Sequence, residues 1–407
     1  MARRAPIPFR SRVRTGRVRS GRVRSGLEEL LARPGRLRGL RVGLIANPTT
    51  VTPDLVHASL VLKQSRAFRL TALFGPEHGI RADAQDLVEV EDSRDPATGL
   101  PVFSLYGKTR IPTAEMLSGV DALVFDVQDV GARYYTFIYT MLHALQACAR
   151  HRRRLVVLDR PNPLGGTALE GNVLEPEYLS FVGLHPLPPR HGMTVGELAL
   201  LFREELGLDA DLHVVRMRGW RREMAFEDTG LPWVMPSPNM PTVDTAWVYP
   251  GGCVVEGTNL SEGRGTTRPF ELVGAPWLDP WRLARDLEKE RLPGVRFRPT
   301  YFTPTFQKHA GRPCGGLQLH VTDRRRFASY LTYLLLIFHA RRQDAARFAW
   351  RDPPYEYEHV KRPIDILYGS DEFRRSVEQG VSPRRLARGW KAGLERFRRR
   401  RARYLLY

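Results

Sequence analysis

The feature that most constrains the fold of this chain is a repeated alternation between short apolar runs and segments with helical periodicity. The apolar runs have the length and composition of buried strands and occupy residues 41–47, 70–74, 122–131 and 154–163. The segments with helical periodicity occupy residues 53–65, 135–150 and 193–206. Strands that alternate with helices are typical of βαβ units and a parallel sheet. The sequence therefore predicts a Rossmann-like α/β domain over residues 27–220.

The second half of the chain has a different composition. Pro and Gly become frequent in residues 233–252, and residues 253–277 are too polar and Gly-rich to form a core. The apolar and helical segments that come later predict a smaller α+β domain over residues 221–383. Residues 1–26 are predicted to be a disordered, Arg-rich leader, and residues 384–407 a basic C-terminal tail.

The net charge of +19 is concentrated at the two ends of the chain. Residues 1–26 contain nine Arg and no acid, and residues 384–403 contain nine Arg and one Lys against the single acid Glu395. The body between them is therefore close to neutral. Basic ends without interleaved aromatic residues favour solubility or weak contact with polyanions over a specific nucleic-acid site. We expect no specific nucleic-acid partner.

Cysteine spacing and hydropathy limit the cellular compartments that suit this chain. Cys148, Cys253 and Cys314 are too far apart for a metal motif or a disulfide framework, which fits a reducing compartment. The longest apolar run, residues 330–338, is much shorter than the roughly 20 residues of a membrane span. The leader is basic but lacks the apolar segment of a secretory signal. We expect a cytoplasmic location, and export stays open if the start of the chain is misassigned.

The turn after the first predicted strand is where a nucleotide-binding motif would be expected in this type of fold. It reads NPTT at residues 47–50 instead of the glycine-rich dinucleotide fingerprint, and the sequence also lacks a Walker A motif. A Rossmann-like fold alone therefore does not predict NAD or ATP.

Polar clusters follow several of the predicted strands. Glu77 and His78 come directly after a Gly-Pro break, and the later clusters are residues 126–134, residues 159–162 and the Gly-rich residues 256–268. Ligands of open α/β sheets bind outside the carboxyl ends of the strands. Acids with neighbouring Arg, Tyr and Asn suit the cleavage of a glycosidic bond. One protonated acid donates to the leaving oxygen, and a second group acts as base, nucleophile or stabiliser.

Each of these residues also has a structural interpretation that the sequence leaves open. Glu77 and His78 could be solvated loop residues, and Asp126 could be a structural hydrogen-bonding group within an apolar run. Other pairs could be surface ion pairs, namely Asp129 with Arg133 and Glu262 with Arg264. The glycines on both sides of the last pair equally favour a binding loop.

Several long motifs together resemble the NamZ-type exo-β-N-acetylmuramidases. They lie between about residues 42 and 368 and read GPEHG, DVQDVGARYYT, DRPNPLGG, RHGMTVGELA, SPNMPT and EGTNLSEGRGTTRPFE. This family comprises bacterial glycoside hydrolases of cell-wall turnover, once catalogued only as a domain of unknown function. The resemblance implies a cleft between the two domains and release of non-reducing terminal N-acetylmuramic acid from peptidoglycan fragments. It also implies that no metal or organic cofactor is used.

On this resemblance, Glu77 matches the family's catalytic acid, and His78 could tune it or relay a proton. The residues expected to bind substrate are Asp129, Arg133, Tyr134, Arg160, Asn162, Glu256, Asn259, Glu262 and Arg264. Because muramic acid carries a lactyl carboxylate, the candidates to bind it are Arg133, Arg160 and Arg264. A general acid must keep its proton near neutral pH, which requires burial or a nearby carboxylate. The alternative function is a non-catalytic muropeptide- or glycan-binding protein on the same fold.

Overall fold

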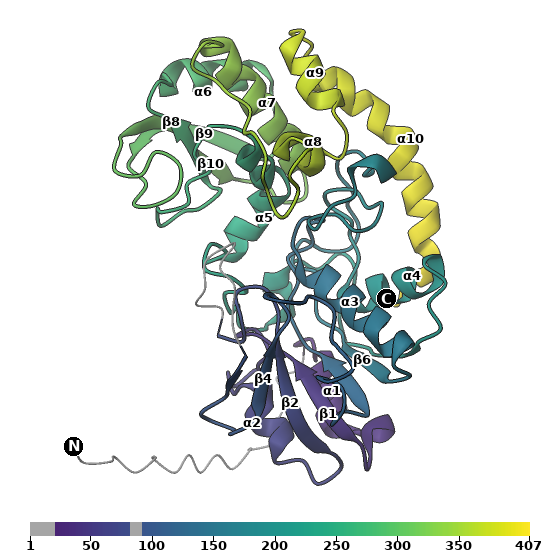
Figure 1. Cartoon of the computed structure of the whole chain (residues 1–407). Helices are drawn as coiled ribbons and strands as arrows, with labels where there is room; N and C mark the ends of the chain where they lie inside the picture. Colours follow the sequence, from purple (N-terminus) through teal and green to yellow (C-terminus); the bar gives the residue numbers. More distant parts are fainter. Residues whose placement is uncertain (1–20, 82–91) are drawn as a thin grey trace, which may run out of the picture.

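The computed structural model describes residues 21–81 and 92–407, and the predicted leader over residues 1–20 lies outside this part. Within these residues the chain forms two lobes. The lower lobe in Figure 1 contains a seven-stranded sheet, and the upper lobe contains a three-stranded sheet. The predicted α/β domain followed by a smaller α+β domain is confirmed.

The first lobe is built on a nearly all-parallel sheet. Its strands are β1 (Arg41–Ile45), β2 (Arg69–Gly75), β3 (Ser93–Arg94), β4 (Pro101–Ser104), β5 (Ala122–Phe125), β6 (Arg154–Leu158) and β7 (Asp211–Val215). They are arranged in the order β3-β4-β2-β1-β5-β6-β7, and only β3 runs antiparallel to its neighbour. From β1, the chain first adds β2 and its neighbours on one side of the sheet, and later adds β5, β6 and β7 on the other side. The carboxyl ends of β1 and β5 therefore form the switch point of the sheet.

The side chains of the central strands alternate between two hydrophobic cores, as the period of two requires. Ala122 and Val124 of β5 face a core shared with α1 (Gly26–Ala32) and α2 (Ala58–Lys63). Leu123 and Phe125 face a second core shared with α3 (Phe137–Arg150) and α4 (Val195–Glu205). This second core continues without a break into the other lobe. The two lobes are therefore packed together through apolar side chains.

The second lobe begins with α5 (Val243–Gly252). The elements that follow are β8 (Leu272–Ala275), α6 (Pro280–Lys289), β9 (Val295–Phe302), β10 (Cys314–Val321), α7 (Ser329–Gln343), α8 (Pro363–Tyr368) and α9 (Glu372–Glu378). Strand β10 lies between β8 and β9 and pairs antiparallel with both. Helix α7 contains the longest apolar run, and neither it nor another helix of the described residues is long and apolar enough to cross a membrane.

The folded part of the chain begins earlier in the sequence than predicted. Residues 21–26 were assigned to the leader, but Val23 is fully buried and Arg24 pairs with Arg218 in an isolated β-bridge. Ser25 caps α1, and the Glu28 carboxylate accepts from the Ser25 N–H in return. This capping box fixes the start of the first helix.

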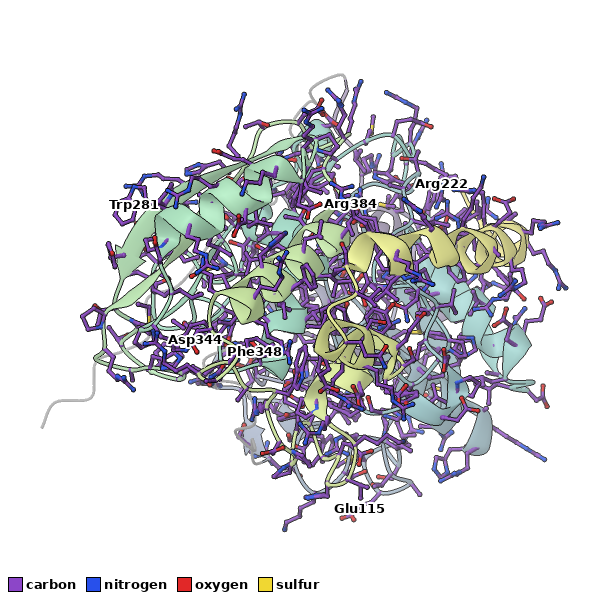
Figure 2. All side chains as sticks on the ribbon, turned by 90° about the horizontal axis from the view of Figure 1, so that it is seen from above. Glu115, Arg222, Trp281, Asp344, Phe348 and Arg384 are labelled. Atoms are coloured by element: carbon purple, nitrogen blue, oxygen red, sulfur yellow. The ribbon has the colours of Figure 1, made fainter. Side chains whose placement is uncertain are left out.

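The carboxy-terminal segment is a helix instead of a tail. Helix α10 (Pro383–Arg401) runs along one side of the molecule from the upper lobe to the lower one, where the chain ends near α4 (Figure 1). Arg384, near its start, forms an ion pair with Glu290 of the second lobe (Figure 2). At its far end, the guanidinium of Arg401 is buried and donates to carbonyls of residues 191 and 192 in the first lobe. The segment therefore straps the two lobes together.

Candidate active site

A pocket of about 570 Å³, counting its open mouth, lies where the two lobes meet. Its polar lining includes Glu77, His78, Thr136, Ser237, Asn239, Glu256, Arg264 and Glu356. Its aromatic lining includes Tyr134, Tyr135, Phe137, Tyr249, Phe270 and Tyr355. Both lobes and the connector between them contribute side chains. The pocket has the lining of a typical small-molecule site, with apolar walls and a few converging polar groups.

Glu77 enters the pocket from a tight turn at the carboxyl end of β2. His78 and Gly79 have φ values of 67° and 76°, and the Gly79 N–H donates to the Pro76 carbonyl at 2.9 Å. A Cβ at residue 75 would meet the Ile80 nitrogen at 2.9 Å, so this close return of the chain requires glycine there. The turn lifts Glu77 out of the sheet, yet only 7% of the residue is exposed.

The carboxyl of Glu77 is oriented by the first lobe. The Thr136 hydroxyl, at the start of α3, donates to Glu77 Oε2. Tyr106, which follows β4, is buried beside it. Burial raises the pKa of Tyr106, and the negative charges of Glu77 and Glu356 raise it further. The carboxyl of Glu77 is therefore buried in a pocket that also holds the carboxyl of Glu356.

Glu256 belongs to a buried network of ion pairs. Arg264 contacts Glu256 at 2.9 Å and Glu262 at 3.4 Å, and Lys308 contacts Glu262 at 2.9 Å. The Tyr355 hydroxyl donates to Glu256 Oε2 at 2.7 Å. Burial alone would raise the pKa of Glu256, but Arg264 and Tyr355 outweigh it and leave the pKa lowered. Glu256 is therefore ionised near neutral pH. Glu262 and Arg264 are both largely buried, so the interpretation of this pair as a solvated surface ion pair is wrong.

The aromatic walls pack mostly edge to face. Tyr249 lies 5.7 Å from Tyr135 and 4.9 Å from Phe270, measured between ring centroids. The Tyr135 hydroxyl donates to Ser237 Oγ at 2.9 Å, which joins the first lobe to the connector. These walls are rigid, because each ring is held by another ring or by a hydrogen bond.

Five predicted residues come together in this pocket, namely Glu77, His78, Tyr134, Glu256 and Arg264. Arg133 has a different position from the one expected. Its guanidinium is fully buried and donates to the carbonyls of Leu187 at 2.8 Å, Leu367 at 2.7 Å and Tyr368 at 3.0 Å. It bridges the first lobe to α8 of the second and is not among the described residues that line this pocket, so its contact with substrate stays a prediction.

Arg160 and Asn162 also lie elsewhere. Arg160 pairs with buried Asp126 at 2.6 Å and borders a second pocket next to Trp233, near the switch point of the sheet. The Asn162 amide donates to the Met193 carbonyl at 2.9 Å, and its Oδ1 accepts from the Leu164 N–H at 3.0 Å. Asn162 thus stabilises a turn in the first lobe.

The remaining predicted residues have structural contacts too. Asp129 accepts from the Gly131 N–H at 2.7 Å and lies 3.6 Å from His191 Nε2. The Asn259 amide donates to the Arg347 carbonyl at 2.8 Å. Glu262 forms ion pairs with both Arg264 and Lys308. Asp129, Asn259 and Glu262 are not among the described residues that line this pocket, and their contact with substrate stays a prediction.

The prediction did not include several residues of the pocket. Ser237 and Asn239 belong to the motif SPNMPT, which was noted without assigning a site residue to it. Glu356 lies in the segment DPPYEYEH at residues 352–359, where two acids and two aromatics follow paired prolines. Thr136 closes the DVQDVGARYYT motif. For Glu356, the local signal was this acid-rich turn.

Comparisons with known proteins agree over most of the chain. The family models described as "Exo-beta-N-acetylmuramidase NamZ" match its N-terminal part over residues 42–244 and its C-terminal part over residues 247–407. The peptidoglycan β-N-acetylmuramidase NamZ of Bacillus subtilis (strain 168) is 49% identical over 373 residues, which cover 91% of this chain and 88% of that protein.

Two crystal structures of DUF1343 family proteins from Bacteroides fragilis NCTC 9343 are similar in fold. One superposes with a TM-score of 0.86 at 37% identity, and the other with a TM-score of 0.75 at 30% identity. Each similarity covers 95% of this chain and 99% of the solved chain.

Proposed function

Because this chain belongs to the NamZ family of exo-β-N-acetylmuramidases, we propose that it releases N-acetylmuramic acid from the non-reducing ends of peptidoglycan fragments. We assign the reaction to the pocket between the lobes. The observation that carries the proposal is the buried carboxyl of Glu77, which enters this pocket from a strained turn at the end of β2. The product would serve cell-wall turnover and recycling.

Glu77 is the proposed general acid. Its proton passes to the oxygen that links the terminal sugar to its neighbour, and the bond between this oxygen and C1 breaks. The Thr136 hydroxyl holds one carboxyl oxygen and so directs the other toward the pocket. A water oxygen then bonds to C1 and releases one proton, which balances the proton that Glu77 gave up. His78 lines the same pocket and is the candidate to exchange the proton with solvent.

Arg264 is the proposed partner of the lactyl carboxylate. It is favoured over Arg133 and Arg160 because it lines the pocket. Its charge is shared with Glu256 and Glu262, so recognition depends on directed N–H donors and not on net positive charge. We therefore expect the matching N-acetylglucosaminide, which lacks the lactyl group, to be a poor substrate.

The test uses para-nitrophenyl β-N-acetylmuramide and a disaccharide or muropeptide with the same terminal sugar. On the disaccharide or muropeptide, whose sugar leaving group needs a proton, Glu77→Gln should lower turnover at least about a hundredfold, the scale of general-acid catalysis. The matched control is Glu115→Gln, because Glu115 is exposed on the outer surface and labelled there in Figure 2. Near-normal turnover of the disaccharide by Glu77→Gln would remove Glu77 from the chemistry.

The same assay separates the enzyme from a non-catalytic binding protein. A binding protein would retain muropeptides but would release no free N-acetylmuramic acid from them. Equal rates of the wild type on the muramide and the glucosaminide would instead reject the role of Arg264 while leaving the glycosidase activity intact.

The cytoplasmic location stays a prediction. The three cysteines are buried free thiols, which is compatible with a reducing compartment. Fractionation of cells that express the full chain with a C-terminal tag tests it, and recovery outside the cytoplasm would reject it.

A further inference from the structure

We propose that Glu356 is the second catalytic carboxylate, which faces Glu77 from the opposite lobe. The inference rests on the proposed function and extends it to the group that assists the attacking water. Among the described residues, the carboxylates that line the pocket are Glu77, Glu256 and Glu356. Within the described lining, the choice of partner for Glu77 lies between Glu256 and Glu356.

Glu256 is poorly suited to be that partner. Arg264 holds its Oε1 and the Tyr355 hydroxyl holds its Oε2, at 2.9 and 2.7 Å. A base or nucleophile must present a carboxylate oxygen to water or to C1, and both oxygens of Glu256 already accept hydrogen bonds. Its position suits a different role, because Tyr355 directly precedes Glu356. Through Tyr355, the ion-pair network anchors the turn that carries Glu356.

The turn itself holds Glu356 in an unusual backbone conformation. Glu356 and Tyr357 have φ values of 46° and 65°, and both lie in the left-handed region although neither is glycine. The turn is closed by two hydrogen bonds of 2.9 Å between the backbones of Tyr355 and Glu358. Consecutive non-glycine residues in this region persist only where their surroundings fix them, and they concentrate at functional sites. Here the result is a buried Glu356 in the pocket, with 9% of the residue exposed.

Strand register brings this turn next to Glu77. Strands β2 and β4 pair with Gly75 opposite Ser104, so Tyr106 follows β4 at the same level at which Glu77 follows β2. The ring of Tyr106 lies 6.1 Å from that of Tyr357 in an edge-to-face contact. Tyr106 thus lies against both the Glu77 turn and the Glu356 turn. The effect of both carboxylates on the pKa of Tyr106, after that of burial, agrees with this arrangement.

The proposed step is balanced in protons and bonds. The bond from C1 to the bridging oxygen breaks, and that oxygen takes the proton of Glu77. In a direct route, the water oxygen bonds to C1 and its proton passes to Glu356. In a two-step route, Glu356 first bonds to C1, and water then displaces it while its proton returns to Glu77. Both routes yield the free sugar and the shortened glycan, and the configuration of the released sugar distinguishes them.

The test compares leaving groups. Para-nitrophenolate leaves without much protonation, whereas the sugar leaving group of a disaccharide needs it. Glu77→Gln should therefore lose far more activity on the disaccharide than on the chromogenic substrate. Glu356→Gln should lose at least about a hundredfold on both. The control is Glu358→Gln in the same turn, since Glu358 accepts from the backbone N–H groups of Val360 and Lys361 outside the pocket.

A second variant guards against misfolding. Glu356→Ala opens space for a small anion, so formate or azide should restore part of its chromogenic turnover, provided that its circular dichroism spectrum is that of the wild type. A folded Glu356→Gln protein with more than a tenth of wild-type turnover on both substrates would overturn the inference, and so would a folded Glu356→Ala protein that neither anion rescues. Failure of the wild type to release sugar would reject the proposed function itself.

Discussion

Arg133 separates a structural role from a substrate-binding role more sharply than any other residue of the predicted set. The sequence placed it among the cleft arginines, but the structure gives its guanidinium three carbonyl acceptors within 3.0 Å on both sides of the lobe junction. Arg133→Met keeps much of the side-chain volume and removes every one of these donors. We expect the variant to be less stable and to keep its chemistry.

The size of the expected destabilisation depends on which hydrogen-bond donors each carbonyl retains in Arg133→Met. The Leu187 carbonyl still accepts from the Leu174 N–H at 3.2 Å, and the Tyr368 carbonyl from the Asn172 amide at 2.9 Å. The Leu367 carbonyl loses its 2.7 Å donor. Three lost bonds at about 1 kcal/mol each, with more for the donor's charge, give roughly 3–5 kcal/mol. Relief of the buried charge reduces this sum, so we expect a loss of about 2–4 kcal/mol in the free energy of unfolding.

Urea denaturation followed by tryptophan fluorescence measures this loss, and turnover is measured well below the unfolding transition. Arg133→Lys serves as the control, because an ammonium keeps the charge but lacks the planar fork that reaches several carbonyls at once. It should fall between the wild type and Arg133→Met in stability. If Arg133→Met unfolds within about 0.5 kcal/mol of the wild type and yet loses turnover a hundredfold, Arg133 binds substrate and our structural reasoning is wrong.

Two further predictions concern the C-terminal strap. Tyr407→Phe removes the hydrogen bonds of this hydroxyl to Asp159 Oδ2 and to the Met217 N–H, both 2.8 Å, and should cost about 1–3 kcal/mol of unfolding free energy in urea. Tyr301→Phe at a site that is 60% exposed is the control, and equal effects would contradict the prediction. Burial raises the pKa of Asp159 from 3.8 to about 7, so the folded state binds this proton more tightly than the unfolded state. The Asp159 contribution to unfolding free energy should therefore fall as pH rises from about 4 to 7, by up to about 1.4 kcal/mol per pH unit. Asp159→Asn should remove that slope in urea titrations at pH 5, 6 and 7, and an unchanged slope would refute the assignment.

The sheet and the Glu77 turn were predictable because their signals are local. An apolar run that ends in Gly-Pro followed by Glu-His specifies a buried strand, a break and a polar group beyond the carboxyl end of the strand. The distribution of side chains between the two faces of β5 follows from the period of two alone. These features depend on neighbours in sequence, and the structure agrees with them.

The features that the sequence did not reveal share a different origin. The acceptors of Arg133 belong to residues 187, 367 and 368, which no local pattern connects to a motif at residue 133. The arginine count of the last 24 residues concealed an apolar face, in which Leu386, Phe397 and Tyr404 are buried. A charge count describes how a segment interacts with water. It does not show which of its faces packs against the protein.

The proposed chemistry makes the contacts between the lobes part of the active site. Glu77 comes from a strand end of the first lobe and Glu356 from a turn of the second, so the distance between the two carboxyls is fixed only as well as the lobes are fixed. A continuous hydrophobic core crosses this junction together with the Arg133 bridge and the strap of α10, so the core and the strap still hold the lobes together when the Arg133 bridge alone is removed. Catalytic geometry tolerates errors of well under 1 Å before rate is lost. The same contacts that stabilise the fold are therefore the ones that set the spacing of the two acids.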